Sequence, residues 1–302
     1  MPKIITYTTE DEWKALRVDD ITSTDAAALF GLSPYCTEFE LYHRKKSRQI
    51  VEIDSNERMK WGKRLETSIA EGIAEDHGWT VRPLKIYARH STQRGLGSSF
   101  DFEILGDPRG PGILEIKNVD YLQWKKGWIN DGDDSEAPEH IEIQLQHQLE
   151  VIDYNWGAIA ALVSGNSPVT LIRDRDRELG GLICKKTEQF WKDIENGYAP
   201  DPDFKKDASF IKELYLYVSG KELDLSNNNR AVNLCAEYKA ATADEKAVKE
   251  RKDAAKAELL TIIAEHPSAR IGDYKISAGM VNKKEYLVKA MSYRDFRISG
   301  GK

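Results

Sequence analysis

The sequence GILEIKNV, residues 112–119, is typical of a β-strand. Side chains alternate between the two faces of a strand, so Glu115 and Lys117 would lie on one face. The apolar Leu114 and Ile116 would lie on the other face. An acid and a base that share one face form either a surface ion pair or part of a reactive site, and the flanking sequence bears on that choice.

A second extended stretch, LGSSFDFEIL at residues 96–105, precedes this strand. Its side chains alternate in character, which predicts Phe100 and Phe102 on one face of a single strand. Asp101 and Glu103 would then share the opposite face. The stretch therefore predicts a strand that carries carboxylates along one side.

The turn GDPRGPG at 106–112 joins the two stretches into a predicted hairpin. Counting outward from its centre places Asp101 within about two residues of the position opposite Glu115 and Lys117. Hard divalent cations such as Mg²⁺ prefer oxygen ligands, which Asp101, Glu115 and the backbone carbonyl of Ile116 would supply. Two such cations can promote phosphodiester hydrolysis, with Lys117 beside the substrate. The alternative is a solvated strand with a cross-strand ion pair.

Composition narrows the class of protein. The chain has 302 residues, 40% of them hydrophobic and 31% charged, and a formal net charge of −6. We expect no membrane segment and no signal peptide, because no apolar run approaches ~20 residues. Three scattered cysteines favour a reducing cytosolic environment. The negative charge excludes a uniformly basic surface but permits a local phosphate-binding patch, for which the candidate is HRKKSR at 43–48, followed by Arg58, Lys60, Lys63 and Arg64.

Hydrophobic periodicity and capping signals predict the elements around the hairpin. Thr9 would cap a first helix, and Ser23 or Thr24 a second helix that stops at Gly31. The predicted helices are two within 8–30, then 37–47, 58–77, 139–153 and 179–197, with extended chain at 80–89 and strands at 156–165 and 168–176. This order predicts an α/β fold with a mixed sheet flanked by helices.

The composition changes after the sequence YAPDPD at 198–203. Residues 230–266 are rich in alanine, lysine and glutamate, which predicts a long polar helix. The tail at 271–302 has the alternation of a small hairpin. We therefore expect a core at 1–205 and a C-terminal extension at 206–302.

Five stretches of the chain carry motifs in a recognisable order. They are EWKALRVDDITSTDAAALFGLSPY (12–35), KWGKRLETSIAE (60–71), GSSFDFEI with ILEIKN, HIEIQLQHQLEV (140–151) and FWKDIENGYAPDPD (190–203). Together they resemble the PD-(D/E)XK nucleases, and in particular the lambda-exonuclease and YqaJ-type nucleases of phage recombination. The resemblance covers about residues 10–205 and implies a PD-(D/E)XK nuclease-like fold. One departure is Phe100, which stands where the family commonly has proline before the motif aspartate.

The resemblance also implies roles for individual residues. Asp101 and Glu115 would bind metal, and Lys117 would act in catalysis. Glu66, in the motif WGKRLE, would bind a second metal ion or orient water, although a surface glutamate is the ordinary alternative. Gln144 would reach the same pocket from its helix, unless it belongs to an exposed ridge.

Three further residues match the positions that hold a 5′-phosphate in this branch of nucleases. They are Arg17, Thr24 and Ser99. A guanidinium group can bind a phosphate through two hydrogen bonds, and the start of a helix attracts anions. From the residues alone, a surface charge at Arg17 and a simple helix cap at Thr24 explain the same pattern.

The function implied by the resemblance is a 5′→3′ exonuclease acting on double-stranded DNA ends in phage or prophage recombination. The resemblance also implies two Mg²⁺ ions per site, for which Mn²⁺ can substitute. It further implies that the protein forms a trimeric ring. The 3′ single strand would pass to a single-strand annealing protein in the cytoplasm of a bacterial host. Open alternatives are another PD-(D/E)XK repair nuclease, a non-catalytic DNA-end-binding protein, and an interaction protein that works through its C-terminal helix.

Overall fold

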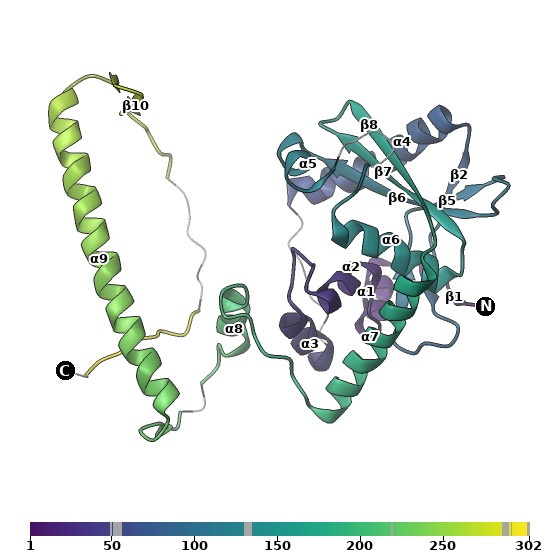
Figure 1. Cartoon of the computed structure of the whole chain (residues 1–302), viewed down its shortest axis with the longest axis horizontal. Coiled ribbons are helices and arrows are strands. Elements are labelled where there is room, and N and C mark those ends of the chain that lie inside the picture. The colour runs from purple at the N-terminus through teal and green to yellow at the C-terminus, as the bar shows by residue number, and fades with distance from the viewer. Residues whose placement is uncertain are drawn as a thin grey trace. The chain divides into compact units, whose positions relative to one another are not determined.

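The computed structural model describes residues 1–48, 50, 56–129, 135–218, 220–285, 290 and 292–300 (Figure 1). The chain divides into two compact units, Met1–Phe210 and Ile211–Lys302. Part of the tail for which a hairpin is predicted, at 286–289, 291, 301 and 302, lies outside the described residues. No helix in the described part of the chain is long and apolar enough to cross a membrane.

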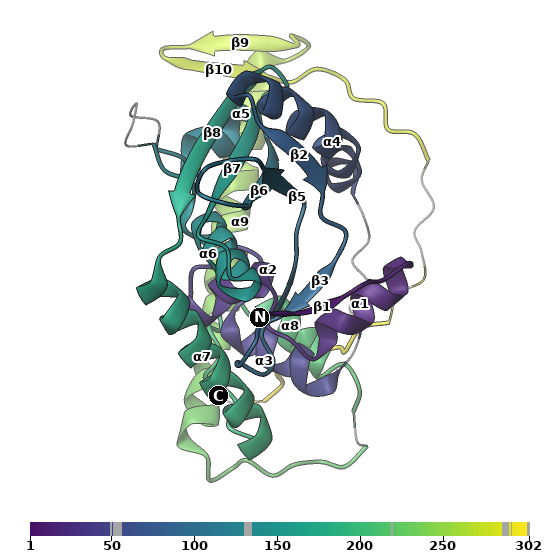
Figure 2. The ribbon, with the colours of Figure 1, turned by 90° about the vertical axis from the view of Figure 1, so that its right-hand side faces the viewer.

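A five-stranded mixed sheet forms the centre of the first unit (Figures 1 and 2). Its strand order is β2-β5-β6-β7-β8. The strands are β2 (Thr80–Pro83), β5 (Phe102–Leu105), β6 (Gly112–Val119), β7 (Trp156–Val163) and β8 (Ser167–Asp174). Only the pair β6 and β7 among these neighbours is parallel. A parallel pair needs a long crossover connection, which α5 (Tyr121–Gly127) and α6 (Glu139–Ile152) provide here.

Two apolar clusters hold helices against opposite faces of this sheet. Helix α4 (Glu57–His77) buries Ile69 and Ile73 against Leu114 and Ile116 of β6. Helix α6 buries its apolar side chains in the other cluster, which contains Ile113 of β6. Because side chains alternate along β6, Glu115 points toward α6. The predicted α/β fold, a mixed sheet flanked by helices, is confirmed.

The predicted single strand at 96–105 is wrong, because the chain changes sheets in its middle. Its first part, β4 (Gly97–Ser99), belongs to a small sheet with β1 (Lys3–Ile5) and β3 (Tyr87–Arg89). A bend at Asp101 separates it from β5, where the Asp101 carbonyl accepts a hydrogen bond from Leu84 N–H at 3.0 Å. In consequence Phe100 packs in the α6 cluster and Phe102 in the α4 cluster, on different faces.

The predicted N-terminal helices are confirmed, with one capping residue corrected. Helix α1 (Glu10–Val18) has Thr9 as its N-cap, in a capping box with Glu12. The next helix, α2 (Ser23–Ala26), is capped by Thr22 rather than by Ser23 or Thr24, because Asp25 accepts the Thr22 N–H at 3.1 Å. A 3₁₀ turn, η1 (Ala27–Phe30), then ends at Gly31 in the left-handed conformation, as predicted.

The remaining helices of the first unit also fall where periodicity places them. They are α3 (Glu38–Ser47), capped by Thr37, and α7 (Arg177–Asn196), ended by Gly197. A short helix, α8 (Ala208–Leu214), follows at the end of this unit and continues into the next. The predicted helix at 58–77 is α4, ended by Gly78.

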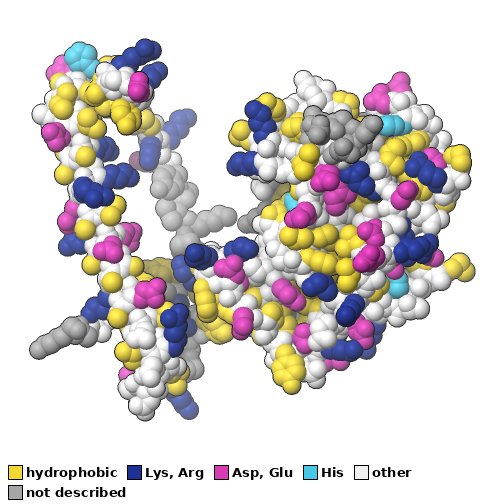
Figure 3. All heavy atoms as spheres, viewed as in Figure 1, with side chains coloured by type: hydrophobic (Ala, Val, Ile, Leu, Met, Phe, Trp, Pro, Cys, Tyr) yellow, Lys and Arg dark blue, Asp and Glu magenta, His cyan; other side chains and the backbone are white. Residues whose placement is uncertain are grey.

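The second unit contains the predicted long helix, α9 (Asn229–Ile263). Figure 3 shows acidic, basic and hydrophobic side chains interspersed along it, and Ile263 is its buried residue. The hairpin is formed by β9 (Ser268–Ile271) and β10 (Tyr274–Ser277), so its first strand lies before the tail in which we expected it. The turn between the two strands contains Gly272, which has a positive φ of 57°.

Candidate active site

The structure brings Asp101 next to β6. Phe102 of β5 pairs with Leu114, so the preceding residue, Asp101, lies level with the middle of β6. The backbone N–H of Ile116 donates a hydrogen bond of 2.9 Å to Asp101 Oδ2. The bend between β4 and β5 therefore does not remove this carboxylate from the sheet; it turns the carboxylate onto the neighbouring strand.

Glu115, Lys117 and Gln144 form a closed triangle of hydrogen bonds. Lys117 Nζ donates to Glu115 Oε1 at 2.5 Å and to Gln144 Oε1 at 3.0 Å. Gln144 Nε2 donates to the same Glu115 oxygen at 2.6 Å. Gln144 is only 9% exposed, so the alternative of an exposed ridge on α6 is wrong. All three side chains are thereby held in one arrangement.

Electrostatics show that the carboxylates repel one another. Burial raises the pKa of Asp101 well above its usual value, and the nearby charges of Glu115 and Glu66 raise it further. Burial also raises the pKa of Glu66, with Glu115 as the next contributor. Glu66 of α4 therefore lies within electrostatic range of the cluster, half-buried at its edge.

Lys117 alone does not balance these acids. Burial acts to lower the pKa of Lys117, but the charges of Glu115 and Asp101 outweigh burial and raise it above its usual value. Lys117 is therefore a protonated ammonium group at neutral pH. Lys63 and Lys85 also act on Glu66, and Lys117 is the lysine that is hydrogen-bonded to the carboxylate of Glu115. An oxygen-rich donor set of three carboxylates suits hard divalent cations.

A second group of metal-ligating residue types lies elsewhere, at His90, Glu150 and Cys184. The N–H of Gln93 donates to His90 Nδ1 at 2.8 Å, which places the ring proton on Nε2, 3.3 Å from Glu150 Oε1. Arg175 occupies the other Glu150 oxygen at 2.8 Å, and burial raises the pKa of Cys184 to about 11. The hydrogen bonds and the ion pair that these side chains already make account for the group within the fold.

Arg17 and Thr24 also lie together. Arg17 Nη2 donates to Thr24 Oγ1 at 3.0 Å, and the guanidinium group stacks on the Trp13 ring, 4.5 Å from its centroid. Thr24 is exposed. Ser99 ends β4, two residues before Asp101. The structure thus places Ser99 beside the carboxylate cluster and pairs Arg17 with Thr24.

Tyr7 is a residue near both groups that the motifs did not indicate. Burial raises the pKa of Tyr7; the charge of Arg17 opposes this shift, and the charges of Asp101 and Glu66 add to it. Its phenol therefore lies within electrostatic range of Arg17 on one side and of the carboxylates on the other. Only the tertiary structure reveals this, since Tyr7 belongs to no recognisable motif.

One residue of the basic stretch at 43–48, Lys45, faces inward and is not available to bind phosphate. Lys45 is largely buried and donates to the carbonyl oxygens of Arg17 at 2.9 Å and Asp20 at 2.6 Å. It also pairs with Asp25 at 2.9 Å; burial acts to raise the pKa of Asp25, but Lys45 and Arg17 lower it to about 2. The amphipathic position of Lys45 on α3 directs it inward, where it ties α1 to α2.

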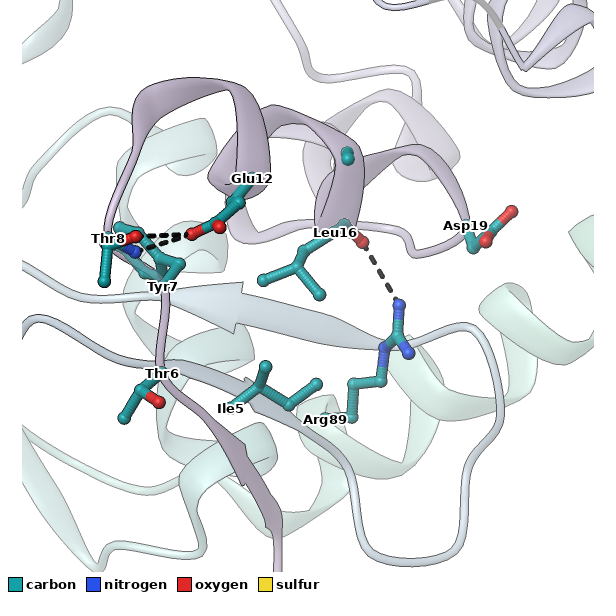
Figure 4. A pocket seen from close by; sticks show the side chains of 9 residues that line it. Ile5, Thr6, Tyr7, Thr8, Glu12, Leu16, Asp19 and Arg89 are labelled. Carbon is teal, nitrogen blue, oxygen red and sulfur yellow. Dashed lines mark hydrogen bonds between the residues drawn. The ribbon is translucent and has the colours of Figure 1, made fainter.

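A cavity of about 510 Å³ lies beside α1 (Figure 4). Its lining includes Tyr7, Glu12, Leu16, Asp19 and Arg89. Arg89 is already engaged, since it donates to the Leu16 carbonyl at 3.3 Å and pairs with a buried aspartate. Glu12 accepts the Thr8 N–H at 2.8 Å as part of the helix cap. The charged groups of this cavity serve the fold, which leaves the carboxylate cluster on β6 as the candidate active site.

Comparison with known proteins agrees with the motifs. Residues 12–155 match the YqaJ-like viral recombinase domain. The chain is also 32% identical over 229 residues to the uncharacterized protein YqaJ of Bacillus subtilis strain 168, across 75% of this chain and 67% of that protein. The chain belongs to the YqaJ family. This family membership confirms the resemblance to YqaJ-type nucleases that the motifs indicated.

Solved structures show what fold the YqaJ-type chain has. The alkaline exonuclease LHK-Exo of Laribacter hongkongensis superposes with a TM-score of 0.51 at 19% identity, covering 67% of this chain and 99% of that one. The same exonuclease in complex with dAMP gives a TM-score of 0.50 at 20% identity, with the same coverage. The chain therefore shares its fold with this alkaline exonuclease, in agreement with the nuclease-like fold that the motifs imply.

Proposed function

We propose that this YqaJ-family protein is a divalent-metal-dependent exonuclease that digests one strand of double-stranded DNA from its 5′ end. The observation that carries the proposal is the meeting of Asp101, Glu115, Lys117 and Gln144 around strand β6 of the sheet. The similarity to an alkaline exonuclease that has been solved with dAMP, a deoxynucleoside monophosphate, supports the same reaction class.

The carboxylates of Asp101, Glu115 and Glu66, with the carbonyl oxygen of Ile116, would hold two Mg²⁺ ions, and Mn²⁺ would substitute. When bound, the cations neutralise charge on the scissile phosphate and lower the pKa of a water molecule. The residues fit such ions because all of them offer oxygen donors, and because neighbouring carboxylate charges, together with burial, raise the pKa of Asp101 and of Glu66. A cation at this point would offset the carboxylate repulsion that, after burial, raises the pKa of Asp101.

Lys117 would act as a hydrogen-bond donor rather than as a base. Its raised pKa keeps the ammonium group protonated at neutral and mildly alkaline pH. The ammonium group would hold the attacking water or a phosphate oxygen, where charge develops in the transition state. Gln144 accepts a hydrogen bond from the Lys117 ammonium group and donates one to the Glu115 carboxylate, so it keeps both groups in place.

Arg17, Thr24 and Ser99 would bind the 5′-phosphate of the DNA end. Arg17 and Thr24 supply adjacent donors, and Tyr7 has both Arg17 and Asp101 within electrostatic range. A terminal phosphate held near Arg17 would set which end of the strand enters the carboxylate cluster. This arrangement is our basis for assigning 5′→3′ polarity.

Replacing Arg17 by alanine is expected to slow digestion of 5′-phosphorylated DNA about tenfold or more, because a charge-assisted contact contributes roughly 1.5–3 kcal/mol. Digestion of 5′-hydroxyl DNA would change far less. Initial rates on the two substrates give the measurement. The partly exposed Lys14 on the same helix, which pairs with Glu10, is changed to alanine as the matched control. Equal slowing on both substrates would show that Arg17 does not bind the 5′-phosphate.

The biological setting follows from the family. We infer that the protein works in phage or prophage recombination in the cytoplasm of a bacterial host. There it would form a trimeric ring on DNA and leave a 3′ single strand for an annealing protein. We also infer that residues 1–205 form the nuclease core, since every proposed site residue lies at or before Gln144, and that 206–302 form an extension.

The proposal is tested with linear duplex DNA labelled at either the 5′ or the 3′ end. With Mg²⁺ we expect early release of the 5′ label and late release of the 3′ label, and chelation by EDTA should stop both. Early release of the 3′ label would reverse the assigned polarity. Binding of DNA ends without any release in Mg²⁺ or Mn²⁺ would instead identify a non-catalytic end-binding protein.

A further inference from the structure

Three glutamines of α6, at positions 144, 146 and 148, are buried in the sequence QLQHQ. Gln144 and Gln148 are four residues apart, which places them on the same face of the helix, while Gln146 lies on another. The proposed function gives a role to Gln144 only. The hydrogen bonds of the other two differ in a way that separates a structural glutamine from a functional one.

Gln146 uses both ends of its amide to hold the backbone together. Its Nε2 donates to the Asp174 carbonyl at 2.9 Å, and its Oε1 accepts from the Asp176 N–H at 2.8 Å. It thereby ties α6 to the end of β8 and the cap of α7. A buried amide with both ends bonded to backbone is fully explained by the fold.

Gln148 is bonded differently, although it is only 1% exposed. Its Nε2 donates to Glu115 Oε2 at 2.7 Å and, more weakly, to the Ser99 carbonyl at 3.4 Å. Its Oε1 has no hydrogen-bond partner among the described residues. Turning the amide over would place Oε1 against the Glu115 carboxylate, two acceptors in contact, so the bond to Glu115 fixes its orientation.

An orphaned buried carbonyl is unfavourable for the fold. The donor end of Gln148 is therefore the part of this side chain that the site uses. The Ser99 carbonyl also accepts from Ser98 Oγ at 2.9 Å, so it does not depend on Gln148. What depends on Gln148 is the second oxygen of Glu115, since Lys117 and Gln144 both bind the first.

We propose that Gln148 is a positioning residue, which fixes the carboxylate of Glu115 for binding a divalent cation. Lys117 and Gln144 hold Oε1 from one side, and Gln148 holds Oε2 from α6, so the carboxylate is restrained against rotation about its last bond. The proposal rests on the proposed function, because it takes Glu115 as a metal ligand. Hydrogen bonds to a ligating carboxylate commonly contribute 10–100-fold to metal affinity.

The test measures Mn²⁺ binding to the full-length protein without DNA, by isothermal titration calorimetry and by the electron paramagnetic resonance spectrum of the bound ion. Gln148→Met keeps the length of the side chain and removes the donor, and Gln148→Asn keeps the amide but withdraws it. Both variants are expected to bind Mn²⁺ about 10–100-fold more weakly than the wild type. Gln146→Met, from the same helix and also at a buried position, is the matched control and should retain wild-type affinity.

Thermal unfolding in EDTA, followed by circular dichroism, establishes that each variant is folded. Wild-type affinity in a folded Gln148→Met or Gln148→Asn protein would overturn the proposal. An equal loss of affinity in Gln146→Met would also overturn it, because the effect would then come from the packing of α6. A wild-type protein that binds no Mn²⁺ would instead overturn the metal site itself, which distinguishes failure of the proposed function from failure of the role of Gln148.

Discussion

Lys117→Ala is expected to lower the rate of DNA digestion by at least about 100-fold, the usual effect of removing a donor that stabilises a transition state. Binding of DNA ends should remain largely intact, because Arg17 and Thr24 are separate from Lys117 along the chain and keep their own contact. The measurement is single-turnover digestion of labelled duplex DNA, with end binding determined by fluorescence anisotropy in Ca²⁺.

The control for Lys117 is Lys192→Ala, which removes an exposed lysine of α7 that pairs with Glu188. This variant should digest DNA at close to the wild-type rate. In Lys117→Ala, Gln144 still donates to Glu115, so the local arrangement retains a partner for that carboxylate. Digestion that persists in a folded Lys117→Ala protein would contradict the assigned site.

Asp101→Asn is expected to abolish digestion while leaving the metal-free protein at least as stable as the wild type. The amide removes one negative charge from a buried group of acids, which lessens the repulsion among the remaining carboxylates. It still offers an oxygen to the Ile116 N–H. Activity is measured with Mg²⁺ and with Mn²⁺, and the thermal midpoint is measured in EDTA.

The pH dependence of stability independently tests the raised pKa of Asp101. An aspartate whose folded pKa is raised stabilises the fold below its unfolded pKa of about 4, and this contribution is lost as the pH rises through the folded pKa. In EDTA the wild type should therefore lose stability above about pH 4 more steeply than Asp101→Asn. A lower thermal midpoint for Asp101→Asn at pH 7 would contradict the repulsion described here.

Asp107→Asn serves as the matched control for Asp101. Asp107 lies in the turn of the same hairpin, where hydrogen bonds from Arg109 lower its pKa to about 2. Its carboxylate faces this arginine rather than the site. Asp107→Asn should keep wild-type activity. If it lost as much activity as Asp101→Asn, the substitutions would be acting on the hairpin rather than on the carboxylate cluster.

Much of the framework was predictable because its signals are local. The glycine- and proline-rich turn at 106–112 fixes the hairpin, and the hairpin sets the register of Asp101 against β6. Helix ends at Gly31, Gly78 and Gly197 follow from the left-handed conformation that glycine adopts without strain. Such features depend on a few neighbouring residues and need no tertiary information.

Other parts depend on contacts between distant segments and escape sequence reasoning. Alternation at 96–105 gave no sign of the bend at Asp101, because the bend comes from joining two different sheets. The basic stretch at 43–48 gave no sign that Lys45 points inward and donates to carbonyl oxygens at the end of α1 and just after it. Gln148 resembles its neighbour Gln146 in sequence, and only their hydrogen-bond partners separate them.

The parallel pairing of β6 with β7 also determines when the carboxylate cluster becomes complete during synthesis. The hairpin that carries Asp101 and Glu115 closes through short-range contacts, but Gln144 and Gln148 reach it only after α6 has formed and β7 has paired across the crossover. Contacts of long sequence separation form late, and a chain still emerging from the ribosome lacks the segments that make them. A nascent or truncated chain that ends before Glu139 lacks α6 and therefore carries the acids without their glutamine partners.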